Sequence, residues 1–240
     1  MQRRLIVNAD DYGLSEDVNF GILRAHRQGI VTSASLMVRW PSAQDAVQQA
    51  NGLDLGLHID LAEWAFRHGE WVLLYQRVSF NELDALKSEI RSQLDLFRSL
   101  TGRNPSHLDS HQHVHLQEPV RSLLKQMADE LSVPLREMTP KIRYCGSFYG
   151  QSGKGEPCPD AISLAALIEL LRDLPPGFTE LACHPGNGTK LDSTYCRERA
   201  LEAEVLCDPR VKQTLLDENI RLCTFYDVAK TMAISQPLQT

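Results

Sequence analysis

The chain has 240 residues, 42% of them hydrophobic, which is enough for the core of one α/β domain. The formal net charge is -6, the pI is about 5.8, and the lysines and arginines form no basic stripe. This charge makes nucleic acid and an anionic membrane surface poor candidates as partners.

No run reaches the ~20 apolar residues that a membrane span requires. The N-terminal Met1-Gln2-Arg3-Arg4 leads directly into a short apolar run, without the longer apolar stretch and cleavage site of a signal peptide. We therefore expect a cytoplasmic protein. None of the cysteines forms a C-x-x-C pair, so a structural zinc site is disfavoured and reduced thiols are expected.

Strand-like and helix-like segments alternate along the first half of the chain. Residues 4–9 form a short apolar run, and Ser15 is placed to cap a helix that ends before Gly29. Residues 31–38 and 53–61 predict strands, with a helix at 42–51 between them. Apolar side chains recur every three to four positions in residues 82–100, which predicts a long helix capped by Asn81 and followed by Gly102.

The alternation continues in the second half of the chain. It predicts strands at residues 106–109, 134–138, 178–183 and 221–225, and helices at 119–131, 161–174, 194–206, 208–218 and 226–232. Residues 139–159, rich in Gly, Ser and Pro, predict a long loop. This pattern favours about seven parallel strands in one α/β domain, residues 1–234, followed by a polar tail, residues 235–240. A closed or nearly closed barrel and an open doubly wound sheet both fit the periodicity.

Polar side chains are found where the predicted strands end. They are Asp10 and Asp11 after the first strand, His58 and Asp60 near the end of the third, Asp109 to His115 after the fourth, Arg136 on the fifth, and His184 after the sixth. In a parallel α/β fold all of these strand ends lie on one face, which is the catalytic face of a barrel and the ligand crevice of an open sheet. We therefore expect these residues to converge.

The adjacent carboxylates Asp10 and Asp11 repel each other unless a cation or a proton lies between them. The alternative is a solvated turn, since Tyr12-Gly13 follows and the backbone turns there. His58 lies in an apolar strand, where a histidine is either a metal ligand or a hydrogen-bonded core residue.

Three of the eight histidines fall within the segment His111-Gln112-His113-Val114-His115. Imidazole is the commonest metal ligand among side chains, and the alternative is a solvated polar loop. The spacing does not decide which histidine binds, because all three share one side of a strand and the outer two share one side of a helical turn.

A third cluster, His184-Pro185-Gly186, follows the apolar Leu181-Ala182-Cys183. With a metal site nearby, an imidazole with a pKa near 6.5 is suited to protonate a leaving group, whereas alone it would be an incidental residue of a turn. Arg136 is suited to hold an aspartate or a substrate oxygen, or to form an ordinary ion pair.

In order along the chain, these segments resemble the YdjC-like carbohydrate deacetylases, the group of the chitooligosaccharide and hopanoid-associated deacetylases. The resemblance is carried by Val7-Asn8-Ala9-Asp10-Asp11-Tyr12-Gly13, Gly29-Ile30-Val31-Thr32-Ser33, Gly56-Leu57-His58, His107-Leu108-Asp109-Ser110-His111-Gln112-His113-Val114-His115 and Cys183-His184-Pro185-Gly186. It implies a distorted (β/α) barrel related to the polysaccharide deacetylases, and relatives are often homodimers.

The resemblance also implies the roles of the site residues. Asp10 falls on the general base and His184 on the general acid, while Asp11, His58 and His111 fall on ligands of a divalent metal ion. His115 matches a later histidine whose role as a further ligand or a substrate contact stays open. Magnesium is the usual ion of the family, with zinc and other divalent ions as alternatives.

The implied reaction is hydrolysis of the N-acetyl group of an amino sugar or a short N-acetylglucosamine-containing oligosaccharide. One departure from the family pattern is the short stretch 62–80, which holds Trp64, Phe66, Trp71 and Tyr75. These aromatic side chains either pack in the core or form a stacking surface for sugar rings. The alternatives are a phosphoesterase, which would need a basic phosphate cluster, a sugar isomerase, and a non-catalytic sugar-binding protein.

Overall fold

The computed structural model describes residues 2–188 and 195–234. The predicted polar tail, residues 235–240, and the first residue of the helix predicted at 194–206 lie outside this part of the chain. The described residues form a seven-stranded sheet in which every pairing is parallel, in the order β6-β3-β2-β1-β8-β7 with β9 also beside β1. The predicted α/β class with about seven strands is confirmed. The strands are β1 (Arg3–Tyr12), β2 (Ser33–Leu36), β3 (Asp54–Ile59), β6 (Leu108–Ser110), β7 (Ile142–Cys145), β8 (Gly177–Cys183) and β9 (Ile220–Leu222).

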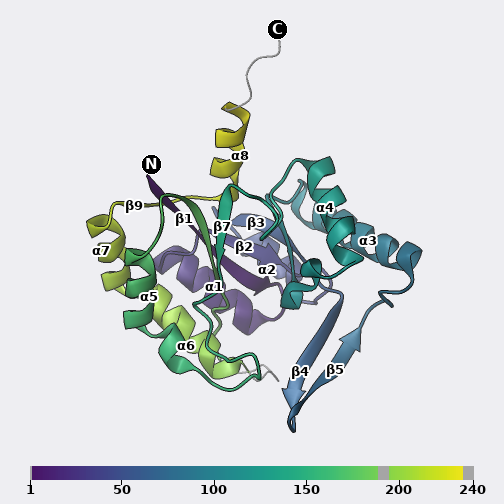
Figure 1. Ribbon diagram of the computed structural model, residues 1–240, viewed down its shortest axis with the longest axis horizontal. Helices are drawn as coiled ribbons and strands as arrows, with labels where there is room; N and C mark the ends of the chain where they lie inside the picture. Colours follow the sequence, from purple (N-terminus) through teal and green to yellow (C-terminus); the bar gives the residue numbers. More distant parts are fainter. Residues whose placement is uncertain (1, 189–194, 235–240) are drawn as a thin grey trace.

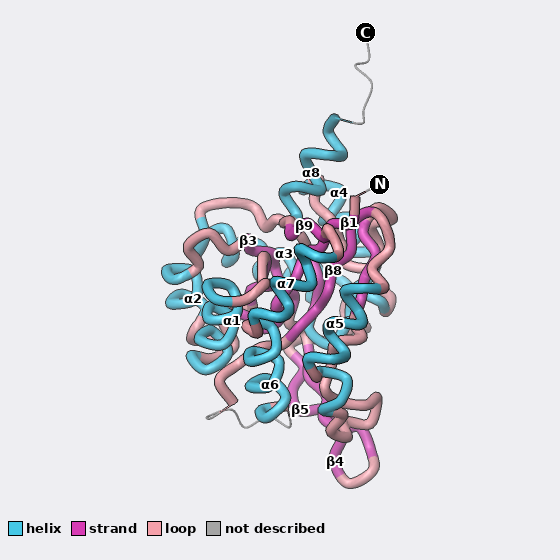
Figure 2. Tube along the Cα trace, turned by 90° about the vertical axis from the view of Figure 1, so that its left-hand side faces the viewer, coloured by secondary structure: helices cyan, strands magenta, loops and turns pink. Residues whose placement is uncertain are grey.

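Helices surround the sheet, as Figures 1 and 2 show from two directions. No helix in the described ranges is long and apolar enough to cross a membrane. Ser15 caps α1 through a hydrogen bond to the Val18 amide, and Gly102 ends α3 in a left-handed conformation, both as predicted. The N-cap of α3 is Glu82 and not Asn81. The helices are α1 (Glu16–Gln28), α2 (Ala43–Gln49), α3 (Leu83–Thr101), α4 (Val120–Leu131), α5 (Leu164–Arg172), α6 (Cys196–Leu206), α7 (Pro209–Asp217) and α8 (Phe225–Ile234), with 3₁₀ turns η1 (His111–Leu116) and η2 (Pro159–Ile162).

Strand β1 is the centre of the sheet. It pairs with β8 along residues 3–9, while β9 lies beside its first residues and β2 beside its last. The successive apolar side chains of Leu5, Ile6 and Val7 are all fully buried, as expected for a strand of a parallel sheet that is covered on both faces. Because β1 is central, its carboxyl end lies at the middle of the face where the parallel strands end.

The strand predicted at residues 134–138 is wrong. Only Leu135 pairs there, through one isolated bridge to Leu108, because Pro134 has no amide hydrogen and Met138 turns back onto the Leu135 carbonyl. The strand that packs beside β8 is β7, which lies inside the predicted loop 139–159.

Residues 62–76 form an antiparallel hairpin, β4 (Ala62–Arg67) and β5 (Glu70–Gln76), which was not predicted. Its turn is His68-Gly69, both with positive φ, as a tight two-residue hairpin turn requires. The hairpin projects from the end of the molecule opposite the termini (Figures 1 and 2). Buried Asp60 anchors it, accepting hydrogen bonds from Tyr75 and Arg77.

Candidate metal centre and active site

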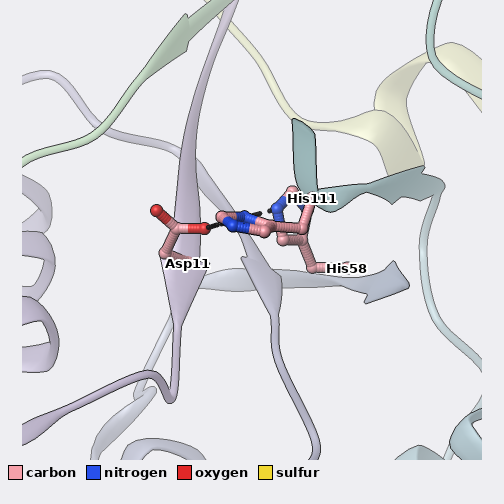
Figure 3. Close-up of side chains that lie close together, drawn as sticks. All are labelled: Asp11, His58 and His111. Atoms are coloured by element: carbon pink, nitrogen blue, oxygen red, sulfur yellow. Dashed lines mark hydrogen bonds and ion pairs between the residues drawn. The ribbon is translucent and has the colours of Figure 1, made fainter. Parts of the chain in front are cut away.

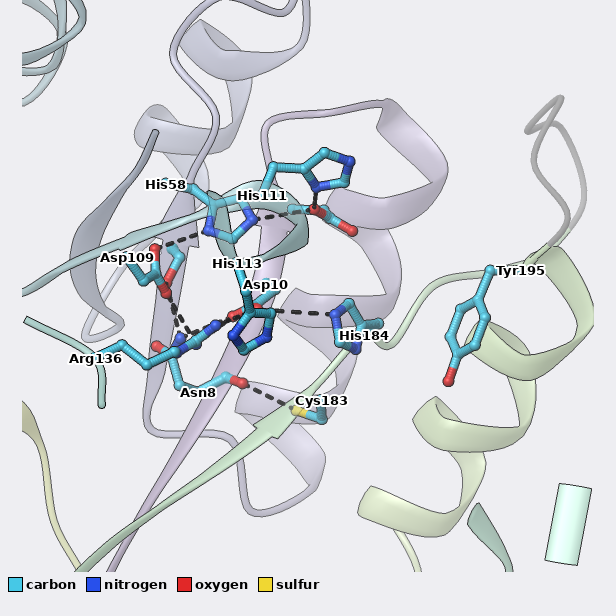
Figure 4. Close-up of polar contacts among 12 residues, drawn as sticks. Asn8, Asp10, His58, Asp109, His111, His113, Arg136, Cys183, His184 and Tyr195 are labelled. Atoms are coloured by element: carbon cyan, nitrogen blue, oxygen red, sulfur yellow. Dashed lines mark hydrogen bonds and ion pairs between the residues drawn. The ribbon is translucent and has the colours of Figure 1, made fainter. Parts of the chain in front are cut away.

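The residues predicted at the strand ends do converge. A cleft of about 330 Å³ is lined by Asp10, Asp11, His58, His111 and His184, from β1, β3, η1 and the segment after β8. Figure 4 shows Asp10, His58, His111 and His184 together, and Figure 3 shows Asp11 beside the two histidines His58 and His111. The parallel topology explains the convergence, because all of these strands end on the same face.

A β-bulge explains how two neighbouring aspartates reach one site. In a regular strand, Asp10 and Asp11 would point to opposite faces. The register between β1 and β2 shifts between Ala9 and Tyr12, and Asp11 has a φ of 68°. A bulge redirects one side chain, and aspartate is among the residues that tolerate a left-handed conformation. Both carboxylates are buried and face the cleft.

Asp11, His58 and His111 form a group that could hold a metal ion. Their donor atoms lie within 4.8 Å of one another. The Asp11 Oδ1 atom is 3.0 Å from His111 Nδ1 and 3.4 Å from His58 Nε2 (Figure 3). Two imidazoles and one carboxylate, with the cleft open beside them, are a donor set for a catalytic divalent ion. The three predicted ligands are thus brought together.

Two further residues orient these donors, and neither had been predicted to do so. Asp109 Oδ1 accepts a hydrogen bond from His58 Nδ1 at 2.7 Å, which leaves His58 Nε2 facing Asp11. Arg199, from α6, donates to the other oxygen of Asp11. Such outer partners fix the ring and carboxylate orientation of metal ligands. The Asp-Ser-His segment pointed to Asp109, whereas no local pattern marks Arg199, which lies 188 positions from Asp11.

Asp10 is held by Arg136. Two guanidinium nitrogens donate to its two oxygens at 2.6 and 2.7 Å, and the same guanidinium pairs with Asp109 and Glu180. Burial raises the pKa of Asp10, but Arg136 outweighs burial and holds the pKa below its ordinary value. The Arg136 side chain is fully buried and paired with Asp10, so of the roles considered for it the structure favours holding an aspartate.

His184 faces Asp10 from the opposite side, with its Nε2 3.7 Å from Asp10 Oδ2 (Figure 4). Its backbone amide donates to Glu202, and its Nδ1 is buried without a hydrogen-bond partner among the described residues. Burial lowers the pKa of His184 to about 4, although Asp10 opposes that shift. The ring is therefore harder to protonate than the ordinary imidazole, with a pKa near 6.5, that the sequence suggested.

His115 does not join the triad. It is fully buried, its Nδ1 lies 2.7 Å from Ser110 Oγ, and its nearest cluster of donors is His113 and Glu137.

Aromatic side chains form much of the cleft wall. Trp64, Phe66 and Trp71 come from the hairpin, and Tyr149 and Tyr195 stack on each other beside His184. The fourth aromatic residue of stretch 62–80, Tyr75, does not line the cleft and instead donates a hydrogen bond to Asp60.

Solved structures share this architecture. A crystal structure of an Enterococcus faecalis V583 protein has a TM-score of 0.75 at 24% identity, covering 95% of this chain and 99% of that one. A peptidoglycan N-acetylglucosamine deacetylase has a TM-score of 0.56 at 16% identity, covering 93% and 86% of the two chains. At these identities the likeness shows the fold alone, and it confirms the predicted relation to the polysaccharide deacetylase fold.

The chain belongs to the YdjC-like protein family, whose model matches residues 4–217. It is similar to a chitooligosaccharide deacetylase of Serratia marcescens, with 32% identity over 95% of this chain and 100% of the relative. It is also similar to a carbohydrate deacetylase of Geobacillus stearothermophilus, with 30% identity over 96% of this chain and 100% of the relative. The resemblance seen in the ordered motifs is confirmed.

Proposed function

We propose that this protein is a metal-dependent hydrolase that removes the acetyl group from an N-acetylated amino sugar or a short N-acetylglucosamine-containing oligosaccharide. The observation that carries this proposal is the placement of Asp10 and His184 in one cleft beside the Asp11–His58–His111 triad. The names of the relatives, which are chitooligosaccharide and carbohydrate deacetylases, support the same reaction.

Asp11, His58 and His111 would hold the divalent ion, whose chemistry is polarisation of the acetyl carbonyl and activation of a water molecule. We propose magnesium as that ion, the usual one of the family, although the two imidazoles also suit zinc. Restoring activity to the metal-stripped protein with each ion in turn distinguishes the two.

Asp10 is suited to be the general base. Its lowered pKa keeps the carboxylate ionised at neutral pH, and Arg136 fixes its orientation. Asp10 takes a proton from the attacking water as the new carbon–oxygen bond to the acetyl group forms.

His184 is suited to be the general acid. Because its ring is hard to protonate at rest, the proton that it donates has to arrive during the reaction. The Asp10 Oδ2 and His184 Nε2 atoms are 3.7 Å apart, so a small movement of the ring would bring them into hydrogen-bond range. The proton then passes from Asp10 to His184, and from His184 to the amine nitrogen as the carbon–nitrogen bond breaks. Acetate and the free amino sugar are the products.

The cleft walls support a sugar substrate. Trp64, Phe66 and Trp71 offer flat apolar faces next to the polar residues of the site. A sugar ring likewise combines an apolar face with polar hydroxyl groups, so the two surfaces are complementary. We further propose that the protein acts in the cytoplasm as one catalytic domain, residues 1–234, and as a homodimer.

Acetate release from a panel of N-acetylated sugars, before and after the metal is removed and restored, tests this function. The Asp10→Asn variant should retain the fold and the metal but lose at least about a hundredfold in rate, since general-base catalysis contributes that much or more. Asp54→Asn is the matched control, because it changes another buried aspartate, at the first residue of β3. Full activity of Asp10→Asn would overturn the proposal, as would phosphate release from sugar phosphates without acetate release from the N-acetylated panel.

A further inference from the structure

A second group of metal-binding side chains lies beside the triad and has no part in the proposed reaction. It consists of His113 and His115 from η1 and Glu137 from the segment after Arg136, with donor atoms within 4.8 Å of one another. The His113 Nδ1 and Glu137 Oε1 atoms are 2.9 Å apart. Two imidazoles and one carboxylate are again brought together, by residues other than Asp11, His58 and His111.

His115 supplies an independent reason to look for a ligand. It is 0% exposed, and its Nδ1 is already paired with the Ser110 hydroxyl at 2.7 Å. Its Nε2 is buried and has no hydrogen-bond partner among the described residues. A buried imidazole nitrogen without a partner is costly, so native proteins almost always satisfy such an atom. The Nε2 atom is the donor that remains for a ligand.

The site is open on its other side. The side chains of His113 and Glu137 are 36% and 30% exposed, so both can rotate toward a shared centre while Ser110 holds His115 in place. A zinc ion with ligands at about 2.0–2.2 Å needs donors closer together than the present limit of 4.8 Å, and these two partly exposed side chains supply that movement. The Nδ1 atom of His113 faces Glu137, while the Tyr144 hydroxyl lies 3.2 Å from the Nε2 atom on the other edge of the ring.

We propose that His113, His115 and Glu137 bind a second divalent transition-metal ion of the Zn²⁺ class. Nitrogen donors favour such an ion over magnesium, which prefers six oxygens. The ion would connect η1, which also carries His111, to the segment that carries Arg136. It would thereby reinforce the isolated Leu108–Leu135 bridge, which joins β6, directly before η1, to the segment of Arg136.

The test is the stoichiometry of Zn²⁺ binding to the metal-stripped full chain, measured by equilibrium dialysis and elemental analysis. The wild type should bind two equivalents, and His113→Asn and Glu137→Gln one each. His68→Asn is the matched control, because His68 and His113 both have positive φ near 50°, which asparagine tolerates, and His68 lies in the hairpin turn. His111→Asn should bind one equivalent, and the His111→Asn/His113→Asn double variant none. Circular dichroism shows whether each variant is folded.

Each other outcome is decisive. One equivalent in the wild type that disappears with His111→Asn but persists in His113→Asn and Glu137→Gln would overturn the second site and leave the triad intact. One equivalent that disappears only with His113→Asn and Glu137→Gln would support the second site and overturn the triad. Two equivalents in every variant would place the extra ion elsewhere on the surface and overturn this inference.

Discussion

At the residue scale, the site depends on bringing two neighbouring aspartates into one cleft while giving each a different partner. The β-bulge at Asp11 sends both carboxylates into the cleft, and different arginines then hold them: Arg136 pairs with Asp10 and Arg199 with Asp11. The sequence marked the pair as a candidate metal and base site only together with the histidine segments and the family resemblance, and the structure places both carboxylates in the cleft. It was insufficient for Arg199, because a single arginine inside a helix carries no signal until the fold brings it to Asp11.

Asp109 provides a test of how the triad is positioned. Asp109→Asn should weaken metal binding by about 10- to 100-fold, because the carboxylate that orients His58 through Nδ1 is replaced by a neutral amide. Competition with a chelator of known affinity measures the change, with Asp54→Asn as the control. An unchanged affinity in Asp109→Asn would show that His58 does not need this partner.

At the element scale, prediction succeeded where the apolar pattern was long and failed where strands were short. Helix α3 has an apolar stripe over 19 residues, and its limits were predicted to within a residue. Strand β7 has only four residues, of which just Ile142 is buried, so its sequence lacks both a run and an alternation. The segment at 134–138 is apolar enough to resemble a strand, but Pro134 and the turn at Met138 prevent a ladder.

The hairpin was missed for a different reason. Strand β5 is mostly exposed, and its burial does not alternate as a half-buried strand would. It is held by side chains, through Tyr75 and Arg77 to Asp60, more than by an apolar face. The hairpin residues Trp64, Phe66 and Trp71 are therefore available for the cleft.

Trp71 tests the hairpin's role in substrate binding. It is 54% exposed and lines the cleft, so Trp71→Ala should raise KM by about two- to tenfold while leaving stability nearly unchanged, in line with ~0.5–1.5 kcal/mol for an aromatic contact. Leu73→Ala is the control, since Leu73 is an exposed residue of the same strand that does not line the cleft. Steady-state kinetics on sugars of increasing length provide the measurement, and equal effects of the two variants would contradict a stacking role.

Asp54 predicts a pH dependence at the junction of β3 and α8, where its carboxylate accepts a hydrogen bond from the Phe225 amide. Burial raises the pKa of Asp54 from 3.8 to about 6. The folded protein therefore keeps this proton between pH 4 and 6 while the unfolded chain has released it, so stability should fall as pH rises through that window. The loss should be about 2–3 kcal/mol, and Asp54→Asn should remove it. Urea unfolding at several pH values measures both proteins, and parallel curves would contradict the assignment.

At the scale of the whole molecule, alternating strands and helices were enough to predict that distant polar residues share one face. They were not enough to decide how the barrel is completed. The segment around Leu135 pairs only with β6, while β7 pairs with β8 at the other edge of the sheet. Arg136 connects the elements across the interior, because its guanidinium pairs with Asp10 of β1, Asp109 of β6 and Glu180 of β8. The same side chain thus holds Asp10, the proposed general base, and joins three strands of the sheet.

This connection predicts that Arg136→Met destabilises the protein far more than a surface substitution does. The variant would leave three buried carboxylates without their cation, and breaking a buried ion pair by removing one partner costs about 3–5 kcal/mol. Glu180→Gln is the informative comparison: burial raises the pKa of Glu180 to about 7 despite Arg136, and glutamine keeps an oxygen for the Arg136 Nε hydrogen bond. That variant should therefore change stability by less than about 1 kcal/mol. The shift in the urea unfolding midpoint measures the stability of both variants. A wild-type midpoint for Arg136→Met, like that expected for Glu180→Gln, would contradict the prediction and show that the ion pairs of Arg136 are not needed for stability.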